Sequence, residues 1–216
     1  MNKNFLPKVI GIALLTIVGC SHGSDGMSEN IADTTSTITN NDSTENNNSS
    51  PASKSEGTLT VNLNFTHGNT LASNQYAIWV EDNDGNLVRT IFVTAFTGNG
   101  GYERRKDACP TWVSKAHPSD LSAAEVDAFT GATPSNGRHS YTWDGKDDKG
   151  NYVKAGTYKI FVEGTLYWSS RVLYEGSFNY GGKGQNVTLT PSFSSDDDTN
   201  RDMLTQVTAE YTPNMR

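Results

Sequence analysis

Short runs in which apolar and polar residues alternate recur along the chain from residue 58, and they constrain the fold more than any other feature. In the first run, Leu59, Val61, Leu63 and Phe65 alternate with polar side chains, so one face of a strand is apolar. Further runs rich in β-branched and aromatic residues lie at 75–81, 87–96, 138–143, 157–166, 171–180, 185–191 and 205–211. Glycine, asparagine and aspartate separate them. This pattern predicts a mainly β fold, an antiparallel β-sandwich that forms a single domain over residues 58–216.

One segment departs from the period of two. Residues 119–129 carry apolar side chains at helical spacing, and Ser122 followed by Glu125 has the form of a capping box. Ser119 is a second candidate for the N-cap, of a longer helix. We therefore expect one short helix over about 119–129. Residues 102–118 show no regular pattern and are expected to be irregular.

The first nineteen residues have the pattern of an export signal. Two lysines precede an apolar run, Val9 to Val18, that is too short to span a bilayer. The run ends in L-T-I-V-G-C, which resembles the lipobox of bacterial lipoproteins and implies lipidation of Cys20. Because Ser21 rather than aspartate follows, the sorting rule of that class favours an outer-membrane anchor facing the periplasm. The other possibility is an ordinary secreted protein in which Cys20 occurs by chance.

Residues 20–57 would begin with the lipid anchor and continue as a tether. Serine, threonine and asparagine dominate the segment and it has no aromatic residue, so it cannot bury enough apolar surface to fold. We expect it to be disordered.

The whole chain has a formal net charge of −7, which argues against nucleic acid as a partner, because such binding needs a basic surface.

No metal site is expected from the residue types that usually hold one. If Cys20 is lipidated, Cys109 is the only remaining thiol, so neither an intramolecular disulfide nor a cysteine metal site can form. The histidines are scattered along the chain. Three aspartates crowd together in 144–151, but Lys146 stands where a calcium loop needs an oxygen ligand. We interpret 144–151 as a structural turn.

One stretch, D-A-F-T-G-A-T at 127–133, is explained neither by export nor by the β pattern. It resembles the D-x-x-[S/T]-G-A-T flavinylation motif of extracytosolic FMN-binding proteins, which include subunits of sodium-pumping quinone reductases and of related membrane redox complexes. In that family a flavin transferase moves FMN from FAD onto the hydroxyl of the last threonine, as a phosphodiester. The resemblance implies that Thr133 is the acceptor and that the other cofactor-site residues are Asp127, Thr130, Gly131 and Ala132.

The residues of this motif suit an acceptor that a second protein must reach. Gly131 and Ala132 leave the backbone bare, and Pro134 restricts Thr133 toward an extended conformation. A plainer interpretation is that Thr130 and Gly131 only end the helix, with Gly131 near the C′ position, and both can hold. Nearby side chains that could stack on a flavin or pack in the core are Trp112, Phe129, Tyr141 and Trp143. Arg138 and His139 could offset the phosphate charge or simply begin a solvated strand.

A wider pattern surrounds the motif. It consists of E-D-N-D-G-N-L-V-R-T at 81–90, T-W-D-G-K-D at 142–147 and A-G-T-Y at 155–158. With the motif, it resembles the DUF2271 family of predicted periplasmic proteins of unknown function, over most of residues 58–180. Members of that family are thought to be encoded near flavin transferases and PepSY-type membrane proteins. The segment Trp143–Tyr158 also resembles the immunoglobulin-like module of flagellar hook-capping proteins, where it is a structural hairpin, and this makes the expected sandwich immunoglobulin-like.

These resemblances imply an extracytosolic, membrane-tethered flavoprotein with FMN attached to Thr133. Its expected partners are a flavin transferase and membrane redox proteins, and it would carry electrons rather than turn over a substrate. The alternative is a non-catalytic β-sandwich lipoprotein that binds a ligand or serves as a scaffold and has no cofactor.

Overall fold

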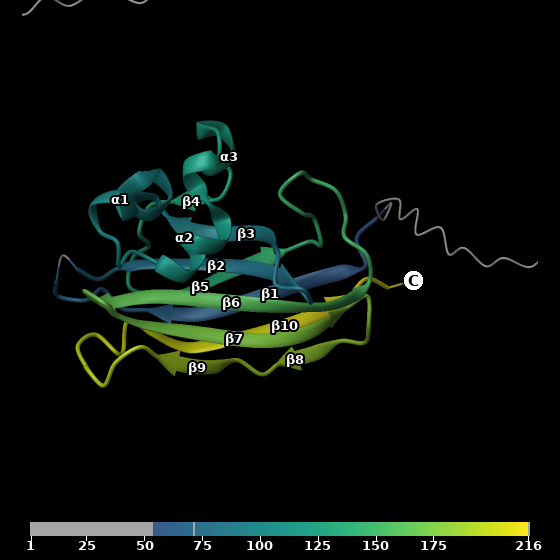
Figure 1. Cartoon of the computed structure of the whole chain (residues 1–216). Helices are drawn as coiled ribbons and strands as arrows, with labels where there is room; N and C mark the ends of the chain where they lie inside the picture. Colours follow the sequence, from purple (N-terminus) through teal and green to yellow (C-terminus); the bar gives the residue numbers. More distant parts are fainter. Residues whose placement is uncertain (1–53, 71, 216) are drawn as a thin grey trace, which may run out of the picture. The chain divides into compact units, whose positions relative to one another are not determined.

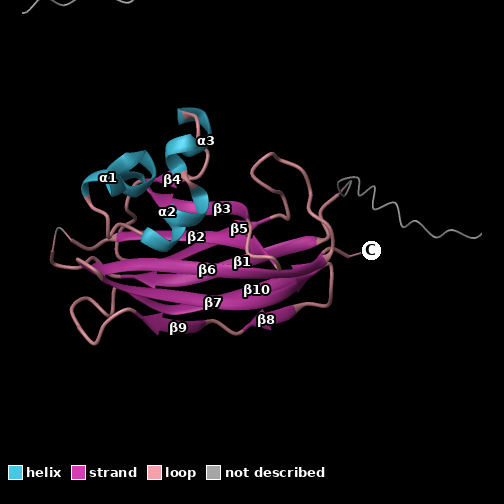
Figure 2. Cartoon of the chain, viewed as in Figure 1, coloured by secondary structure: helices cyan, strands magenta, loops and turns pink. Residues whose placement is uncertain are grey.

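The computed structural model describes residues 54–70 and 72–215, and they form a mainly β domain (Figures 1 and 2). The expected signal peptide, the lipidation of Cys20 and the tether up to residue 53 lie outside the described residues. The expectation that the tether is disordered up to residue 57 was wrong at its end, because the first strand begins at Gly57 and Glu56 donates its backbone N–H to the Tyr180 hydroxyl at 2.9 Å.

Two sheets face each other, which confirms the predicted β-sandwich. In order across the first sheet, the strands are β5 (Gly137–Trp143), β1 (Gly57–Phe65), β10 (Leu204–Pro213) and β8 (Gln185–Val187). The second sheet contains β4 (Thr130–Gly131), β3 (Leu87–Thr94), β2 (Gln75–Asp82), β6 (Gly156–Tyr167), β7 (Ser170–Tyr180) and β9 (Thr190–Phe193). Neighbouring strands are antiparallel except β3 and β4, which pair in parallel. The second sheet is therefore mixed at one edge.

The main core lies between the sheets and follows the predicted alternation. The four apolar side chains of β1 are at most 2% exposed, and they face Tyr76, Ile78 and Val80 of β2. Burying one such side chain is worth about 1.5–3 kcal/mol relative to leaving it in water, so β1 alone anchors the sandwich firmly. Trp143 and Tyr158 also pack in this core, with ring centroids 5.7 Å apart. The Trp143–Tyr158 segment therefore has the structural role that the sequence predicts.

Residues 95–129, here called the helical insert, connect β3 to β4 on the outer side of the six-stranded sheet (Figure 2). The insert contains a π-helical turn η1 (Thr97–Gly101), α1 (Tyr102–Arg104), α2 (Pro110–Ala116), a 3-10 turn η2 (Pro118–Asp120) and α3 (Ala123–Asp127). The expectation that 102–118 is irregular was wrong, and the helix expected over 119–129 is shorter, with a 3-10 turn before it.

The missed helix α2 begins without a local capping signal. Its first free backbone N–H groups, those of Thr111 and Trp112, donate to the buried carboxylate of Glu163 on β6, at 3.1 and 2.9 Å. Burial raises the pKa of Glu163, and the two N–H groups and Arg171, 3.5 Å away, act in the opposite direction. Because the capping group is about fifty residues away in the sequence, the pattern of 102–118 alone cannot reveal this helix.

The helical insert encloses a second, smaller core against the sheet. Trp79 stacks on Phe161 with centroids 5.1 Å apart on the sheet side. From the insert, Trp112 is fully buried, and its indole N–H donates to Thr90 at 3.1 Å. The other buried members of this cluster are Ala77, Val93, Cys109, Ala116, Val126 and Phe129. Val126 of α3 and Phe129 of the D-A-F-T-G-A-T stretch are thus core residues.

Ser122 is the N-cap of α3, and its replacement should cost measurable stability. Its hydroxyl accepts the Glu125 N–H, and the Glu125 carboxylate accepts the Ser122 N–H at 2.8 Å, so the predicted capping box is present. We expect Ser122→Ala to lower the free energy of unfolding in urea by about 1 kcal/mol. Ser119→Ala is the matched control and should change it by less than about 0.5 kcal/mol, because Ser119 is exposed and is not the N-cap of a helix. Equal losses in the two variants would contradict the assignment of the cap.

Candidate functional site

The D-A-F-T-G-A-T stretch passes from a helix to an edge strand and then crosses between the sheets. Asp127 is the last residue of α3, and Thr130–Gly131 form β4 at the edge of the six-stranded sheet. The Phe129 carbonyl accepts the N–H of Val93 at 3.0 Å. Residues 132–136 then lead to β5, the edge of the four-stranded sheet. Thr133 therefore lies in a loop that joins the edges of the two sheets.

Close packing requires the small residues of the stretch. A Cβ on Gly131 would lie 2.6 Å from Cε2 of Phe92, so a larger residue would require that ring to move. The methyl group of Thr130 in turn occupies the space beside Gly98 that a side chain there would fill. The helix ends at Ala128 in a right-handed conformation, and Gly131 lies in a strand without a positive φ. The interpretation of Gly131 as a C′ residue was therefore wrong.

Thr133 lies outside both cores. Its side chain is half-buried, Ala132 and Asp127 are exposed, and no hydrogen bond engages the Thr133 hydroxyl within the part of the chain that the structure describes. Thr130, Gly131, Ala132 and Thr133 are consecutive, so they lie side by side along the edge of the sheet. Asp127 lies at the helix end, and no hydrogen bond joins it to Thr133 among the described residues. The motif thus presents a hydroxyl rather than a preassembled catalytic group.

A cavity of about 250 Å³ lies beside the start of the stretch. Its residues are Arg89, Leu121, Ala124, Glu125, Ala128, Phe129 and Asp148. The guanidinium of Arg89 is 3.6 Å from the Asp148 carboxylate, and burial raises the pKa of Asp148 while Arg89 opposes that shift. The cavity therefore combines apolar side chains with the Arg89–Asp148 ion pair and a second carboxylate, that of Glu125. The place of Arg89 in this cavity could not be predicted, because the residues of β3 alone do not show which side chains face the helical insert.

The four aromatic candidates have different positions. Trp112, Phe129 and Trp143 are buried, as expected for core residues. Tyr141 is half-buried, lies 4.8 Å from Phe92 between ring centroids, and its hydroxyl hydrogen-bonds to that of Tyr76. Because Phe92 contacts Gly131, this aromatic pair closes the edge of the sandwich beneath the loop. The contribution of Phe92 was not predicted from the sequence.

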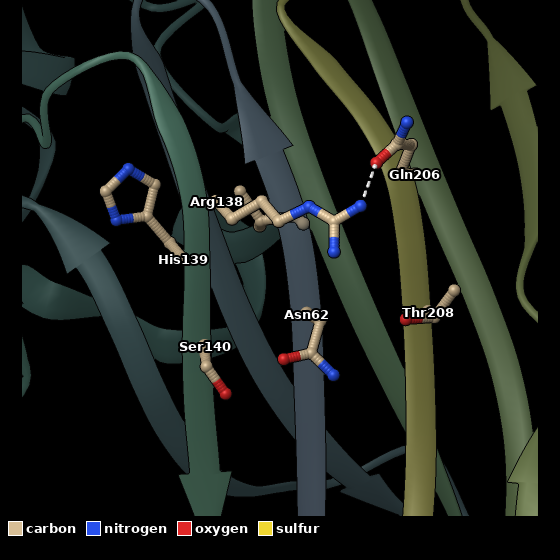
Figure 3. Close-up of a pocket in the computed structure, with 7 residues that line it drawn as sticks. Asn62, Arg138, His139, Ser140, Gln206 and Thr208 are labelled. Carbon is tan, nitrogen blue, oxygen red and sulfur yellow. Dashed lines mark hydrogen bonds between the residues drawn. The ribbon is translucent and has the colours of Figure 1, made fainter.

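Arg138 and His139 point to opposite sides of β5 (Figure 3). Arg138 extends across the four-stranded sheet and donates to the Gln206 side-chain oxygen at 3.3 Å. A ring nitrogen of His139 is 2.7 Å from the Ser135 carbonyl, in the loop that carries Thr133. The two side chains therefore do not form one anion site, and His139 holds the loop.

Cys109 is fully buried in the second core and precedes Pro110 in a left-handed conformation, with φ of 47°. Burial raises the pKa of the Cys109 thiol well above its ordinary value, and the nearby Glu163 carboxylate acts in the same direction. The thiol is therefore held in its protonated, weakly nucleophilic form.

The loop with Thr133 lies at the end of the sandwich opposite the entry of the chain. Gly57 pairs with Pro213 at one end, and Phe65 pairs with Gly137 at the other, next to the loop (Figure 1). Phe96, just after β3, and Trp168, in the β6–β7 turn, also lie at the loop end and are 39% and 56% exposed.

Comparisons with known proteins place the domain in a family. A comparison with curated proteins found no match. In the structure itself, no helix within residues 54–70 and 72–215 is long and apolar enough to cross a membrane. A crystal structure of truncated FlgD from Helicobacter pylori is similar over 76% of this chain and 87% of that chain, with 16% sequence identity and a TM-score of 0.30. The model of the family described as predicted periplasmic protein (DUF2271) matches residues 56–194, which span β1 to β9, and the chain belongs to this family.

Proposed function

We propose that the protein is an extracytosolic, lipid-anchored flavoprotein in which FMN is joined to Thr133 by a phosphoester. It would pass electrons between membrane redox proteins and an acceptor, and its lipid anchor at Cys20 would hold it at the outer membrane. The observation that carries the proposal is the complete D-x-x-[S/T]-G-A-T match, with its last hydroxyl half-exposed in a loop at the sandwich edge.

The surroundings of Thr133 suit modification by a second protein. Its hydroxyl is engaged by no side chain of the described part, and the loop lies at the end that also exposes Phe96 and Trp168. The backbone on either side is fixed, by β4 before it and by the His139–Ser135 contact after it. A transferase would therefore bind a loop whose backbone is already fixed and whose acceptor hydroxyl is accessible. Less conformational entropy would be lost on binding than with a flexible loop.

The cavity beside the motif fits the ring of a flavin by its chemistry. Leu121, Ala128 and Phe129 would supply apolar contacts to the ring. Phe129 and Thr133 are four residues apart, so their Cα atoms are separated by at most about 14 Å. The guanidinium of Arg89 would attract the reduced, more negative ring, while the carboxylates of Asp148 and Glu125 would oppose that attraction. When bound, the flavin supplies one- and two-electron transfer, and the protein's own residues bind and orient it.

Co-expression with a flavin transferase tests the proposal. We expect the denatured protein to fluoresce under ultraviolet light, and its intact mass to increase by one FMN phosphoester. Peptide mapping should place the added mass on the fragment that contains Thr133. A dark band beside a labelled positive-control substrate would contradict the proposal and favour the alternative, a binding or scaffolding lipoprotein with no cofactor.

A further inference from the structure

A groove of about 440 Å³ lies on the outer face of the four-stranded sheet (Figure 3). It is lined by Asn62, Leu63, Arg138, His139, Ser140, Gln206 and Thr208. The side chains of Asn62, Ser140 and Thr208 stand on this face around the Arg138 guanidinium (Figure 3). No carboxylate lines the groove, although the chain as a whole is acidic.

A β-bulge shapes the groove. The pairing of β1 with β10 shifts between Asn62 and Asn64, because Asn62 pairs with Thr208 whereas Asn64 pairs with Thr205. In the extra segment Gln206 has φ of 51°, a left-handed conformation that is unfavourable for a residue with a Cβ. Bulges often redirect side chains at functional sites, and here Gln206 accepts a hydrogen bond from Arg138.

Arg138 lacks, among the described residues, the carboxylate partner that three other arginines have. Arg89, Arg171 and Arg201 lie 3.6, 3.5 and 3.0 Å from Asp148, Glu163 and Asp198, in that order. No ion pair involves Arg138 within residues 54–70 and 72–215, where its hydrogen bond goes to the neutral amide of Gln206. A guanidinium has five N–H donors, and a carboxylate is the group that matches its planar fork.

We propose that this groove binds a carboxylate-bearing sugar, such as a uronate residue of an acidic polysaccharide. Arg138 engages the carboxylate, while Asn62, Ser140 and Thr208 hydrogen-bond to sugar hydroxyls, since amides and hydroxyls can both donate and accept. One cation among neutral polar groups suits a single negative charge better than a phosphate with nearly two. The groove is open along the sheet, so a residue within a polymer can enter. This inference does not depend on the flavin.

Titration with an oligogalacturonate and with a neutral oligosaccharide of equal length tests the proposal. We expect the wild-type protein to bind the acidic oligomer at least tenfold more tightly than the neutral one, and more weakly as salt is added. Arg138→Gln should lose that preference. Arg104→Gln is the matched control, because it removes an exposed arginine charge on α1, outside the groove, and it should bind like the wild type.

Gln206→Gly separates a binding role from a folding role. Glycine accepts the left-handed conformation, so this variant should melt at the same temperature as the wild type or higher, yet bind the acidic oligomer several-fold more weakly. Shifts of backbone NMR signals on titration should centre on Asn62, Ser140 and Thr208. Equal affinity for the acidic and neutral oligomers, or unchanged binding by folded Arg138→Gln, would overturn the proposal.

Discussion

Thr133→Ala should contain no covalently bound flavin after co-expression with a transferase, while its fold stays unchanged. The substitution removes the only atom that could form the phosphoester at this position. Thr133 packs in neither core, and its hydroxyl makes no hydrogen bond within the described chain, so the free energy of unfolding should change by less than about 0.5 kcal/mol. The measurement combines fluorescence of the denatured band with intact mass.

Three further variants make this result specific. Thr133→Ser keeps a hydroxyl and should retain some attachment. Thr142→Ala removes an exposed threonine on β5 and should be labelled like the wild type. Thr130→Ala changes the Ser/Thr position of the motif and should lower the yield of attached flavin without abolishing it, because Thr130 is not the acceptor. Full labelling of Thr133→Ala would show that another residue holds the flavin, and would contradict the assignment.

The strands were predictable because their signal is local. The alternation in β1 reports directly which residues face the core, and all four predicted residues are buried there. The capping box of α3 is equally local, since Ser122 and Glu125 are three residues apart. In both cases the groups that interact are near each other in the sequence or repeat with the period of the element.

The elements that could not be predicted depend on distant partners. Helix α2 is capped by Glu163, and Lys115 near its end reaches Glu81 at 3.0 Å, so both ends are held by strands remote in the sequence. The parallel pairing of β4 with β3 is likewise invisible locally, because two residues carry no strand pattern. That pairing decides where Thr133 lies.

In the candidate site, too, some parts could be predicted from the sequence and others could not. The motif identifies Thr133 and the small residues beside it, but it does not reveal that Gly131 is needed for contact with Phe92. Nor does it indicate the cavity with Arg89, which forms only when α3 covers the edge of β3. The groove around Arg138 depends on a bulge at Gln206, and a single extra residue in a strand leaves no pattern in the sequence.

Trp112→Ala should cost about 3–5 kcal/mol in the free energy of unfolding, measured by urea denaturation. The side chain is fully buried, lies 6.0 Å from Phe129 between ring centroids, and donates to the buried Thr90 hydroxyl. Its removal leaves a cavity in the second core and an unpaired hydroxyl. Because Phe129 belongs to the motif, the yield of covalent flavin in co-expression should fall as well.

Two controls separate packing from hydrogen bonding and from the loss of any tryptophan. Trp112→Phe keeps an aromatic ring but loses the indole N–H, so its loss of stability should be clearly smaller than that of Trp112→Ala. Trp168→Ala removes a tryptophan that is 56% exposed and should change stability by less than about 0.5 kcal/mol. A loss below about 1 kcal/mol for Trp112→Ala would mean that the helical insert unfolds apart from the sandwich. The edge that carries Thr133 would then not be held by the second core, and its rigidity would have to come from β4 and His139 alone.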